Sequence, residues 1–464
     1  MPMRLDRVAW CFAVLACAAP ATALAQGFEL NEIGTCATSR GQSVTGATCN
    51  DPSVIYWNPG ATTTLPGWSA YVGLAAIAVG GNFTADITKN VFAGSVPVSF
   101  PPHLFVNYTS KDSRWAVGLG AYVPYGLTSQ WHADFPGRFS AQKAALASVY
   151  IQPNIAYQFA KGWSVGGGPI FGHSTVQLRQ SLDLAQQFAA PGVTFGMLGI
   201  PAGTEFARAK LEGSANAWGF NVGIHGQLTP DWQVGARYLS QLNFKYDDAD
   251  ATFTQSLTNL VVPGGNPLGV PGGTPLDAVL SAEFMNGGPL TKQKVSTRIK
   301  HPAQFEVGLG YTGFTSTTLS ADFQWAQFSV FDKLPVDFHG PAAASSRTLI
   351  EDYNNSWSIR AGIEHGFASG IKGRAGFTYV KSPAPDETVT PLLPDQDRRN
   401  YALGLGIPMS PRFTLDAGYL HVDTSGRRGR IVERTSESQT AEELNSGFYS
   451  LNANIFSLSL RANF

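Results

Sequence analysis

The sequence predicts an all-β chain: an antiparallel β-barrel of about fourteen strands that spans a membrane. Three observations point to it. Charged residues make up only 14% of the 464 residues, below the roughly 25% of ordinary soluble domains. The mean hydropathy is −0.04, which is too low for a bundle of transmembrane helices. Segments that alternate apolar and polar residues recur along the chain, as in strands with one face toward lipid and the other toward a polar lumen.

The first 25 residues have the layout of a secretory signal peptide. Arg4 and Arg7 precede an apolar stretch, and Ala23-Leu24-Ala25 offers a small-residue cleavage site before Gln26. The stretch is too short for a membrane anchor. A lipoprotein cleavage box at Cys17 is the weaker alternative, because the Ala-x-Ala site lies downstream. We therefore expect residues 1–25 to be a signal peptide and the mature chain to be exported.

Residues 26–66 precede the first predicted strand and show little periodicity. They form either a disordered tail or a hatch in the lumen, because a barrel of fourteen strands is wider than its own side chains can fill. Cys36 and Cys49 are the two cysteines that remain after cleavage. In an oxidising compartment they are expected to form a local disulfide, with two free thiols as the alternative. The eight His show no ligand spacing with these Cys, so no metal site is expected.

Residues 67–464 contain about fourteen alternating segments, which we interpret as the barrel. Trp357, Ile359 and Ala361, for example, alternate with Ser358 and Arg360. The approximate ranges are 67–80, 103–110, 115–123, 146–158, 162–176, 213–227, 232–242, 294–312, 316–329, 353–365, 370–380, 398–408, 412–422 and 446–463.

The connections between these segments alternate in length. Those after even-numbered strands are tight turns, and those after odd-numbered strands have about 18 to about 50 residues. This alternation is typical of a bacterial outer-membrane barrel, with short turns on the periplasmic side and long loops outside. A soluble β-sandwich or blade array has no reason to keep every long loop on one side.

Two further features of the predicted strands support a location in the outer membrane. Trp115, Trp163 and Trp232 each open a strand after a short turn, where the aromatic belt of the inner interface lies. The last strand alternates up to Phe464, and such an ending resembles the signal read by the barrel-insertion machinery. We therefore expect the Gram-negative outer membrane, with its lipid and lipopolysaccharide as surroundings.

The predicted lumen face carries charges of both signs. They suit a wet passage or salt-bridged contacts to a hatch, and the alternative is a polar interior without a selective role. The residues are Arg237, Asp322, Arg360, Glu364, Arg374, Asp416 and Arg461.

The third and fourth long loops, about 177–212 and 243–293, are unexpectedly apolar. Apolar residues on outer loops need partners, which are either each other or a hydrophobic ligand. The candidate ligand contacts are Phe188, Phe195, Leu198, Leu260, Val262 and Phe284. In the fourth loop, Asp247, Asp248 and Asp250 form either a solvated acidic cluster or a site for a divalent cation.

Enzymatic interpretations find little support. Gly166-Gly167-Gly168 lacks the Lys-Ser/Thr pair of a phosphate-binding loop, and no Gly-x-Ser-x-Gly elbow is present. We expect no enzymatic activity and no cofactor. The net charge of −1 also gives no electrostatic reason to expect a nucleic-acid partner.

Six motifs, in the right order, resemble the FadL-type outer-membrane transporters of long-chain fatty acids and aromatic hydrocarbons. Gly60 stands where that family usually has Ala. The motifs are Gly27 to Glu32, Asp51 to Ala61 with Asn58-Pro59-Gly60, Pro124-Tyr125-Gly126 with Gly137-Arg138-Phe139, Asp322 to Asp332, Ser382 to Asp386, and Leu393 to Arg398.

The resemblance implies a fourteen-stranded barrel whose N-terminal hatch fills the lumen. It also implies that a hydrophobic substrate lands between the third and fourth loops and moves to an apolar pocket beside the mature N-terminus. Exit then occurs sideways, through an opening in the wall. By position, Phe28 would touch the substrate. Gln26, Gly27, Asn58, Pro59 and Gly60 would act in the hatch, and Gly118, Gly120 and Tyr122 would lie at the wall opening.

The function expected from this resemblance is passive uptake of hydrophobic compounds, with long-chain fatty acids as the first candidate. Uptake of aromatic hydrocarbons by the same route is an alternative. A structural or adhesive barrel whose apolar loops bind a partner is another.

Overall fold

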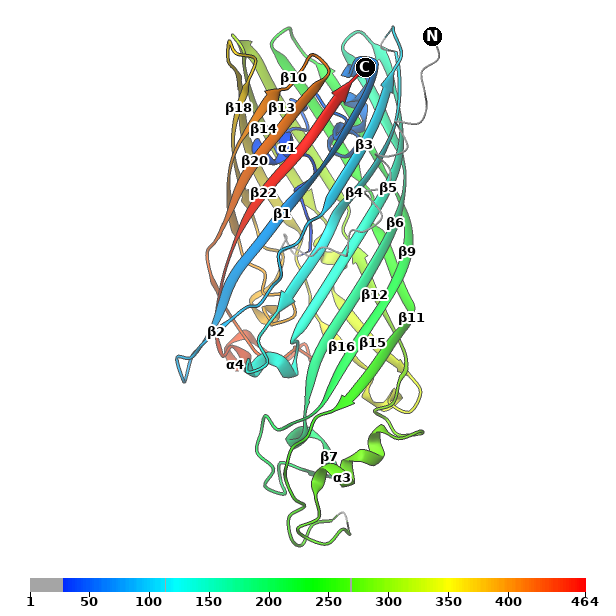
Figure 1. Ribbon diagram of the computed structural model, residues 1–464, viewed down its shortest axis with the longest axis vertical. Helices are drawn as coiled ribbons and strands as arrows, with labels where there is room; N and C mark the ends of the chain where they lie inside the picture. The colour runs from blue at the N-terminus through cyan, green and yellow to red at the C-terminus, as the bar shows by residue number, and fades with distance from the viewer. Residues whose placement is uncertain (1–27, 113, 268) are drawn as a thin grey trace.

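The computed structural model describes residues 28–112, 114–267 and 269–464, and these form a closed antiparallel β-barrel of 14 strands (Figure 1). The first and last strands close the barrel, from the pair Ser69–Asn463 to the pair Ala85–Gly447. In order around the wall, the strands are β1 (Trp68–Ala85), β3 (Pro102–Thr109), β4 (Trp115–Gln130), β5 (Lys143–Ala160), β6 (Trp163–Asp183), β9 (Glu205–Gln227), β10 (Trp232–Leu239), β13 (Gln304–Phe314), β14 (Thr317–Ala326), β17 (Ser356–Gly366), β18 (Lys372–Val380), β19 (Arg398–Pro408), β20 (Phe413–Thr424) and β22 (Gly447–Asn463).

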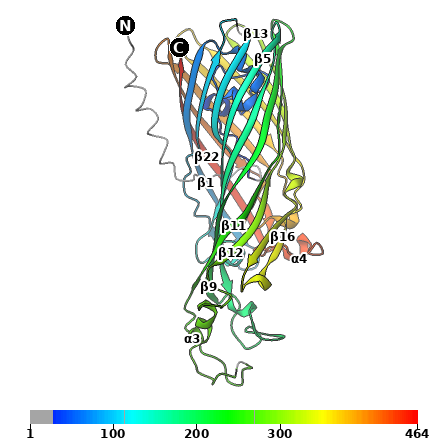
Figure 2. The same ribbon diagram turned by 90° about the vertical axis from the view of Figure 1, so that its right-hand side faces the viewer.

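The predicted strand number and the alternation of short and long connections are confirmed. All short turns lie at the end of the barrel that also holds the C-terminus, and the long loops extend from the other end (Figures 1 and 2). Further strands continue or flank the wall on the loop side: β2 (Val91–Ala93), β11 (Leu242–Gln255), β12 (Gln293–His301), β15 (Lys333–His339), β16 (Arg347–Ile350) and β21 (Arg427–Gly429).

Several strands are longer than their alternation predicts. β6 continues to Asp183 and β9 begins at Glu205, so the third loop is much shorter than 177–212. Asp247, Asp248 and Asp250 lie in strand β11 and not in a loop, which corrects the predicted position of the acidic cluster. The reason is that these outer extensions carry polar residues on their outward face. The backbone ladder continues there although the apolar period has ended.

The outward face of the wall is apolar over its middle. Val165 and Ile359 are exposed side chains there, as is Trp218, which is 70% exposed. Trp115, Trp163 and Trp232 begin β4, β6 and β10 directly after short turns, as predicted. Such a band, bounded by aromatic residues, matches the lipid-facing zone of an outer-membrane barrel. Among the described helices, none is long and apolar enough to cross a membrane.

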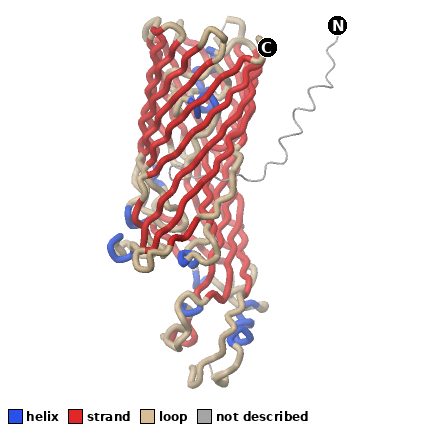
Figure 3. Tube along the Cα trace, turned by 60° about the vertical axis from the view of Figure 1, so that its left-hand side comes forward, coloured by secondary structure: helices blue, strands red, loops and turns tan. Residues whose placement is uncertain are grey.

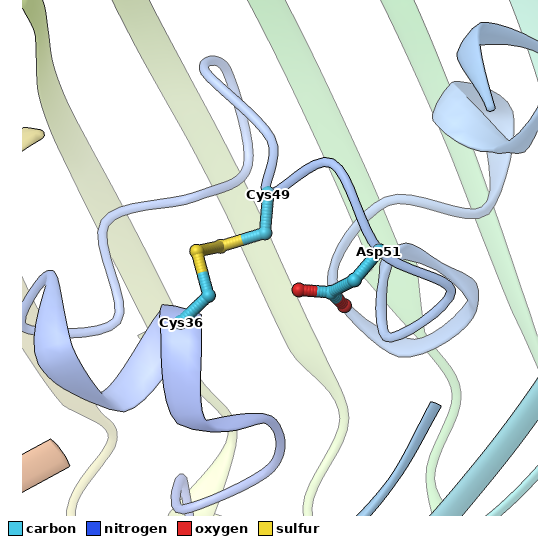
Figure 4. Close-up of side chains that lie close together, drawn as sticks. All are labelled: Cys36, Cys49 and Asp51. Atoms are coloured by element: carbon cyan, nitrogen blue, oxygen red, sulfur yellow. A yellow bond between two sulfur atoms is a disulfide. The ribbon is translucent and has the colours of Figure 1, made fainter. Parts of the chain in front are cut away.

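Residues 28–66 lie inside the barrel, with α1 near the end that carries the short turns (Figures 1 and 3). This segment, here called the hatch, contains α1 (Thr35–Ser39), α2 (Val54–Trp57) and the 3-10 helix η3 (Pro59–Thr64). The predicted disulfide between Cys36 and Cys49 is confirmed (Figure 4). The predicted signal peptide, Gln26 and Gly27 lie outside the described residues.

The loop side carries the remaining short elements. The third loop contains η5 (Leu184–Gln186), β7 (Phe188–Ala190) and β8 (Val193–Thr194), and the fourth contains α3 (Leu276–Leu280) and η6 (Ser281–Phe284). Both project farther from the barrel than the other loops (Figure 1). The others contain η4 (Pro136–Phe139), η7 (Phe328–Val330), η8 (Ala343–Ser345), η9 (Asp386–Thr388) and α4 (Ala441–Leu444).

Candidate functional site

The first described residues of the chain, from Phe28 to Leu30, are held against strand β4. The Leu30 N–H donates to the Pro124 carbonyl oxygen, and the Gly126 N–H donates to the Phe28 carbonyl oxygen, both over 2.8 Å. Strand β4 is locally irregular at this point, because its register with β5 shifts between Tyr122 and Tyr125. The chain therefore forms an isolated antiparallel bridge, between Glu29 and Tyr125, with an irregular wall strand.

An apolar cavity lies in the lumen beside this contact. The cavity has a volume of about 90 Å³. It is lined by Phe28, Leu127, Ala144, Ala145, Leu146, Val176, Gln177, Leu178, Leu211, Glu212, Ala249, Val295, Thr297, Ile299, Phe331, Leu334, Val336, Leu392 and Leu393. Only Gln177, Glu212 and Thr297 among these have polar side chains.

Phe28 packs into an aromatic cluster at this cavity. Its ring centroid lies 5.4 Å from that of Phe331, 5.5 Å from Phe328 and 5.9 Å from Tyr125. Edge-to-face and tilted pairs at these distances are the favoured aromatic geometries. Phe28 is buried. The segment at Phe28 thus supplies one wall of the cavity, and the shape of the cavity depends on where this segment lies.

The cavity has room on its other side because β11 leaves its neighbour β9. The two strands pair up to Asp250 and Glu212, while β10 pairs with β9 from Leu239 and Asn221 onward. Residues 240–249 bend inward between these points. Tyr246, for example, reaches strand β6, where its hydroxyl donates to Ser174 over 2.7 Å.

The hatch is held to the wall by polar contacts around Asn58, Pro59 and Gly60. The Asn58 side-chain amide donates to the Thr45 and Ile224 carbonyl oxygens over 2.9 and 3.0 Å. The Ser164 hydroxyl donates to the Gly60 carbonyl oxygen over 2.8 Å. A Cβ on Gly60 would lie 2.7 Å from the Gly223 carbonyl oxygen. The close approach to the wall explains why glycine occupies position 60 in this chain.

Buried charges on the wall also bind the hatch. Glu306 accepts hydrogen bonds from Arg237 and Arg360 over 2.9 and 2.8 Å. Both guanidiniums also donate to hatch carbonyl oxygens over 3.3 Å, Arg237 to Tyr56 and Arg360 to Gln42. Full burial makes such a network stable only when each charge is paired.

Further predicted lumen charges take part in the same kind of contact. Asp322 accepts from the Thr45 N–H over 2.7 Å, and Arg461 donates to the Asn50 carbonyl oxygen. Arg374 bridges Glu364 and Asp416 within the wall. These charges therefore pair with one another within the wall, and they bind the hatch through hydrogen bonds to its backbone.

Glu29, next to Phe28, extends this network to the start of the hatch. Its carboxylate accepts from the Gln324 side-chain amide over 2.7 Å, and Gln324 in turn accepts from Arg360. Burial raises the pKa of the Glu29 carboxyl, and the Arg360 guanidinium opposes that rise. The position of Phe28 is thus coupled to a buried charge as well as to strand β4.

Gly118, Gly120 and Tyr122 lie just before an interruption of the wall. The ladder between β3 and β4 pairs Asn107 with Gly118 and stops at Leu104 and Ala121. The Tyr122 ring stacks on Phe105, with centroids 5.7 Å apart. Beyond this point β4 still pairs with β5, and its other edge bonds to the segment at Phe28 and Leu30 and farther on to Ser95.

Comparison with known proteins agrees with this architecture. The family model described as "Outer membrane protein transport protein (OMPP1/FadL/TodX)" matches residues 15–464. The chain belongs to this family. Its barrel and its relatives therefore locate it in the outer membrane.

This FadL/TodX-family chain is similar in sequence to two named bacterial proteins. It is 25% identical over 442 residues to the 47 kDa outer membrane protein of Pasteurella multocida, covering 93% of this chain and 94% of that one. It is 23% identical over 420 residues to the long-chain fatty acid transport protein of Escherichia coli O6:H1, covering 85% and 86%.

Two solved structures show the same fold. A FadL homologue of Pseudomonas aeruginosa superposes with a TM-score of 0.76 at 20% identity, covering 94% of this chain and 100% of that one. The Pseudomonas putida toluene transporter TodX gives 0.66 at 16% identity, covering 95% and 100%.

In this family member, the predicted loop contacts lie apart from the cavity. Phe195 and Val262 are buried in a cluster formed by the third and fourth loops, and Leu198, Leu260 and Phe284 pack against it. Phe188 is 72% exposed. Apolar residues of the two loops therefore pack on each other, whereas Phe28 alone among the predicted ligand contacts lines the cavity.

The two candidate cation sites are occupied by protein contacts. Asp250 pairs with Lys294 over 3.1 Å and with Lys292 over 3.5 Å. Cys36, Cys49 and Asp51 lie close together, but the two sulfurs bond to each other and Asp51 accepts from the Ser53 N–H over 2.9 Å (Figure 4).

Sequence reasoning missed most of the cavity. Ala144 and Leu146 on β5, and Val176 and Leu178 on β6, line it from the wall. A signal was present, because Ala144 and Leu146 lie on the face of β5 that is buried and should be polar in a wet lumen. An apolar stretch on the lumen face of neighbouring strands indicates a dry pocket.

Proposed function

We propose that this chain takes up hydrophobic compounds across the outer membrane by passive diffusion, with long-chain fatty acids as the first candidate. The observation that carries the proposal is the apolar cavity between the wall and Phe28. A hydrophobic molecule partitions poorly into a water-filled pore, and an apolar site inside the barrel removes that barrier.

The route has three parts in this proposal. The exposed apolar side chains of the third and fourth loops, with Phe188 foremost, collect the ligand from outside. The ligand then occupies the cavity. It leaves sideways beside Tyr122, where strands β3 and β4 are no longer paired. The hatch blocks a straight path through the barrel, because it lies in the lumen and is hydrogen-bonded to the wall. Flow is driven by removal of the ligand inside the cell.

Uncharged aromatic hydrocarbons are the second candidate. The only ionisable side chain in the lining is the acid Glu212, so a fatty carboxylate would find no cation there. The lining therefore suits an uncharged ligand or the acyl part of a longer one. The similar sequences include a long-chain fatty acid transport protein, and the similar structures include a toluene transporter.

The experiment is to fill the cavity. Val176→Trp places a large ring in the cavity, and Val165→Trp puts the same ring on the outward face of the same strand as a control. The purified variants are titrated with a fluorescent fatty acid and with toluene, and uptake is measured in a strain that lacks the gene.

We expect Val176→Trp to lose binding and uptake and Val165→Trp to keep both. Unchanged binding in the Val176 variant would remove the cavity from the proposal. Unchanged uptake in the strain without the gene would favour a structural or adhesive barrel. The ligand that binds more tightly decides between fatty acids and aromatic hydrocarbons.

A further inference from the structure

Two acidic side chains lie close together where the fifth and seventh loops join beyond the wall strands. Glu351 belongs to the fifth loop, between β14 and β17, and Glu433 belongs to the seventh, between β20 and β22. Glu351 is buried, and one carboxylate oxygen of Glu433 is buried without a hydrogen-bond partner among the described residues. Within the same part of the chain, neither carboxylate has a cation at ion-pair distance. Buried carboxylates without such partners are costly in their charged form.

The contact between the two loops is formed by the neighbours of these acids. The Ile350 N–H donates to the Arg434 carbonyl oxygen over 3.1 Å. The Arg434 guanidinium also pairs with the Asp352 carboxylate over 2.8 Å. Glu351 therefore lies between two residues of the contact, and Glu433 lies directly before a third. A change of charge on the two acids acts at the contact itself.

The same contact lies next to the apolar cavity. Leu349, two residues before Glu351, belongs to a buried cluster with Leu392, which lines the cavity. Tyr353, two residues after Glu351, packs edge to face on Phe331, with ring centroids 5.0 Å apart. Phe331 also lines the cavity. The position of the joined loops therefore affects the lining of the cavity.

Both loops also reach strands far away around the wall. The Ser140 hydroxyl, between β4 and β5, donates to the Ile431 carbonyl oxygen of the seventh loop over 2.7 Å. The Arg347 guanidinium of the fifth loop donates to the Gln180 side chain of β6 over 2.8 Å. Residues 330–353 and 427–437, here called the roof, thus cross the loop-side end of the lumen beside the cavity.

Burial controls the protonation of the two acids. It raises the pKa of the Glu351 carboxyl well above its usual value, and the charge of Glu433 adds to that rise. Burial also raises the pKa of Glu433 to about 7, although Arg347 and Arg430 oppose it. An acid whose pKa is raised in the joined state stabilises that state while protonated, and the stabilisation is lost as the pH rises through that pKa. The roof contact is therefore strongest in acid and weakens above about pH 7.

The groups around the pair do not remove this dependence. Those that face the two acids or their closest cation are Arg347, Asp352, Tyr353, Glu387, Arg430, Arg434 and Tyr449. Arg430 donates to the Asp386 carbonyl oxygen over 3.1 Å, and Tyr449 donates to the Arg430 carbonyl oxygen over 2.8 Å. Arginine stays charged and tyrosine stays neutral between pH 6 and pH 9, so the change of charge falls on the two glutamates.

We propose that Glu351 and Glu433 make the roof a pH-dependent cover of the cavity. The fifth and seventh loops are joined while the pair holds a proton, and they separate when both acids are ionised, because the two charges repel each other in a buried contact. Separation opens the cavity toward the outside. The movement of the loops needs no ligand and is independent of the proposed transport function, whereas its effect on ligand entry rests on that function.

The test measures the distance between the two loops. Ser345→Cys and Ser438→Cys place spin labels on exposed residues of the fifth and seventh loops, and the buried native disulfide takes no label. Distance distributions of the folded protein are recorded at steps from pH 6 to pH 9.

Three forms of this labelled protein are compared. The first keeps all its acids and is called the parent. The second carries Glu351→Gln and Glu433→Gln, which remove both charges and keep the size of the side chains. The control carries Asp134→Asn and Glu442→Gln, which remove two charges from exposed residues of other parts of the loop side.

In the parent, the ratio of joined to separated loops should fall about tenfold from pH 6 to pH 9. This is the change expected when the pKa of one carboxyl is 4.5 with the loops apart and about 7 with the loops joined. The double glutamine variant should keep its loops joined at every pH, and the control should follow the parent. A parent without a pH response, a glutamine variant that separates like the parent, or a control that has lost the response overturns the proposal.

Ligand entry is measured on the same samples with an uncharged fluorescent hydrophobic probe, whose own charge does not change with pH. Its association rate should rise about tenfold from pH 6 to pH 9 in the parent, in proportion to the population of separated loops, and stay constant in the double glutamine variant. Loops that separate without a change in this rate would show that the roof does not cover the ligand path.

If the double variant does not fold, Glu433→Gln alone replaces it. The midpoint of loop separation should then move to higher pH, because the more deeply buried Glu351 retains its proton longer. An unmoved midpoint overturns the role of the pair.

Discussion

Phe28 and Gly126 are joined backbone to backbone: the Gly126 N–H donates to the Phe28 carbonyl oxygen over 2.8 Å. The contact links the start of the hatch to the irregular part of strand β4. Phe28 also lines the cavity. One hydrogen-bonded contact therefore connects the candidate ligand site with the interrupted wall. A substitution at either residue should change the position of the other.

Breaking the neighbouring hydrogen bond of the same pairing, from the Leu30 N–H to the Pro124 carbonyl oxygen, should weaken ligand binding. Leu30→Pro removes the N–H that donates to Pro124, whereas Leu30→Ala keeps it. One hydrogen bond contributes about 1 kcal/mol, so its loss should lower the affinity for a fluorescent hydrophobic probe about fivefold. The fivefold difference is expected between the Pro and Ala variants. If the two variants bind the probe equally, the backbone contact does not hold the cavity in place.

Removing the acid between two buried arginines should destabilise the barrel. Glu306→Gln leaves Arg237 and Arg360 without their shared carboxylate. The expected loss is about 3–5 kcal/mol in the free energy of unfolding, because an unpaired charge stays buried. Urea unfolding in lipid vesicles measures it. The exposed Glu442→Gln change should stay within about 0.5 kcal/mol, and a similar loss there would contradict the network's role.

A methyl group at position 60 should loosen the hatch. In Gly60→Ala the new Cβ would lie 2.7 Å from the Gly223 carbonyl oxygen, which belongs to the wall backbone. Gly94→Ala is the matched control, because its Cβ would meet nothing closer than 3.5 Å. Overpacking costs about 1–3 kcal/mol. Single-channel recordings should show more frequent openings for the Gly60 variant alone, and identical recordings for both would argue against a tight hatch contact.

Removing the disulfide should lower the stability of the hatch. Cys36 and Cys49 are 13 residues apart in the sequence. A disulfide that closes a loop of that size stabilises the folded state by about 3 kcal/mol, because it restricts the unfolded chain. The double variant Cys36→Ser, Cys49→Ser should unfold at lower urea concentration than the parent. A reducing agent should shift the parent toward the variant and leave the variant unchanged. A parent that already unfolds like the variant without reductant would refute the stabilising role.

Two phenylalanines of the third loop should behave differently. Phe195 is buried in the loop cluster and Phe188 is 72% exposed. Phe195→Asp buries a charge and should make the third and fourth loops sensitive to protease. Phe188→Asp should leave them resistant and reduce uptake by cells, if this side chain collects ligand. Normal uptake in the Phe188 variant would restrict the ligand path to the cavity.

Much of the fold could be predicted from the sequence because its signals are local. The alternation of residues such as Trp357, Ser358 and Ile359 indicates the two faces of a strand. The length of each connection indicates the side of the membrane on which it lies. The same reasoning failed at Asp247 and Asp250, which continue strand β11. No periodicity marks a strand that is polar on its outward face and bends inward, since its pairing depends on distant neighbours.

The candidate site was less accessible to this reasoning. Phe28 was identified through the resemblance of the chain's start to a known family. Phe331 and Leu393 lie in motifs of that resemblance but were not recognised as cavity residues, and Val295 was not identified at all. These residues lie far apart in the chain and meet only because β11 and β12 bend into the lumen. The loop apolar residues were recognised, but only the packing shows that Phe195 and Val262 have each other as partners.

The sequence by itself determined that this chain is an outer-membrane barrel, since alternation and loop length are properties of neighbouring residues. It also determined the family, through motifs spread over the whole mature chain. Only the tertiary structure decided where the apolar space lies, which lumen charges hold the hatch, and how Phe28 is seated against β4. The physical reason is that a cavity and a buried ion pair exist between segments, and their positions follow from the register and bends of strands that only the closed barrel brings together.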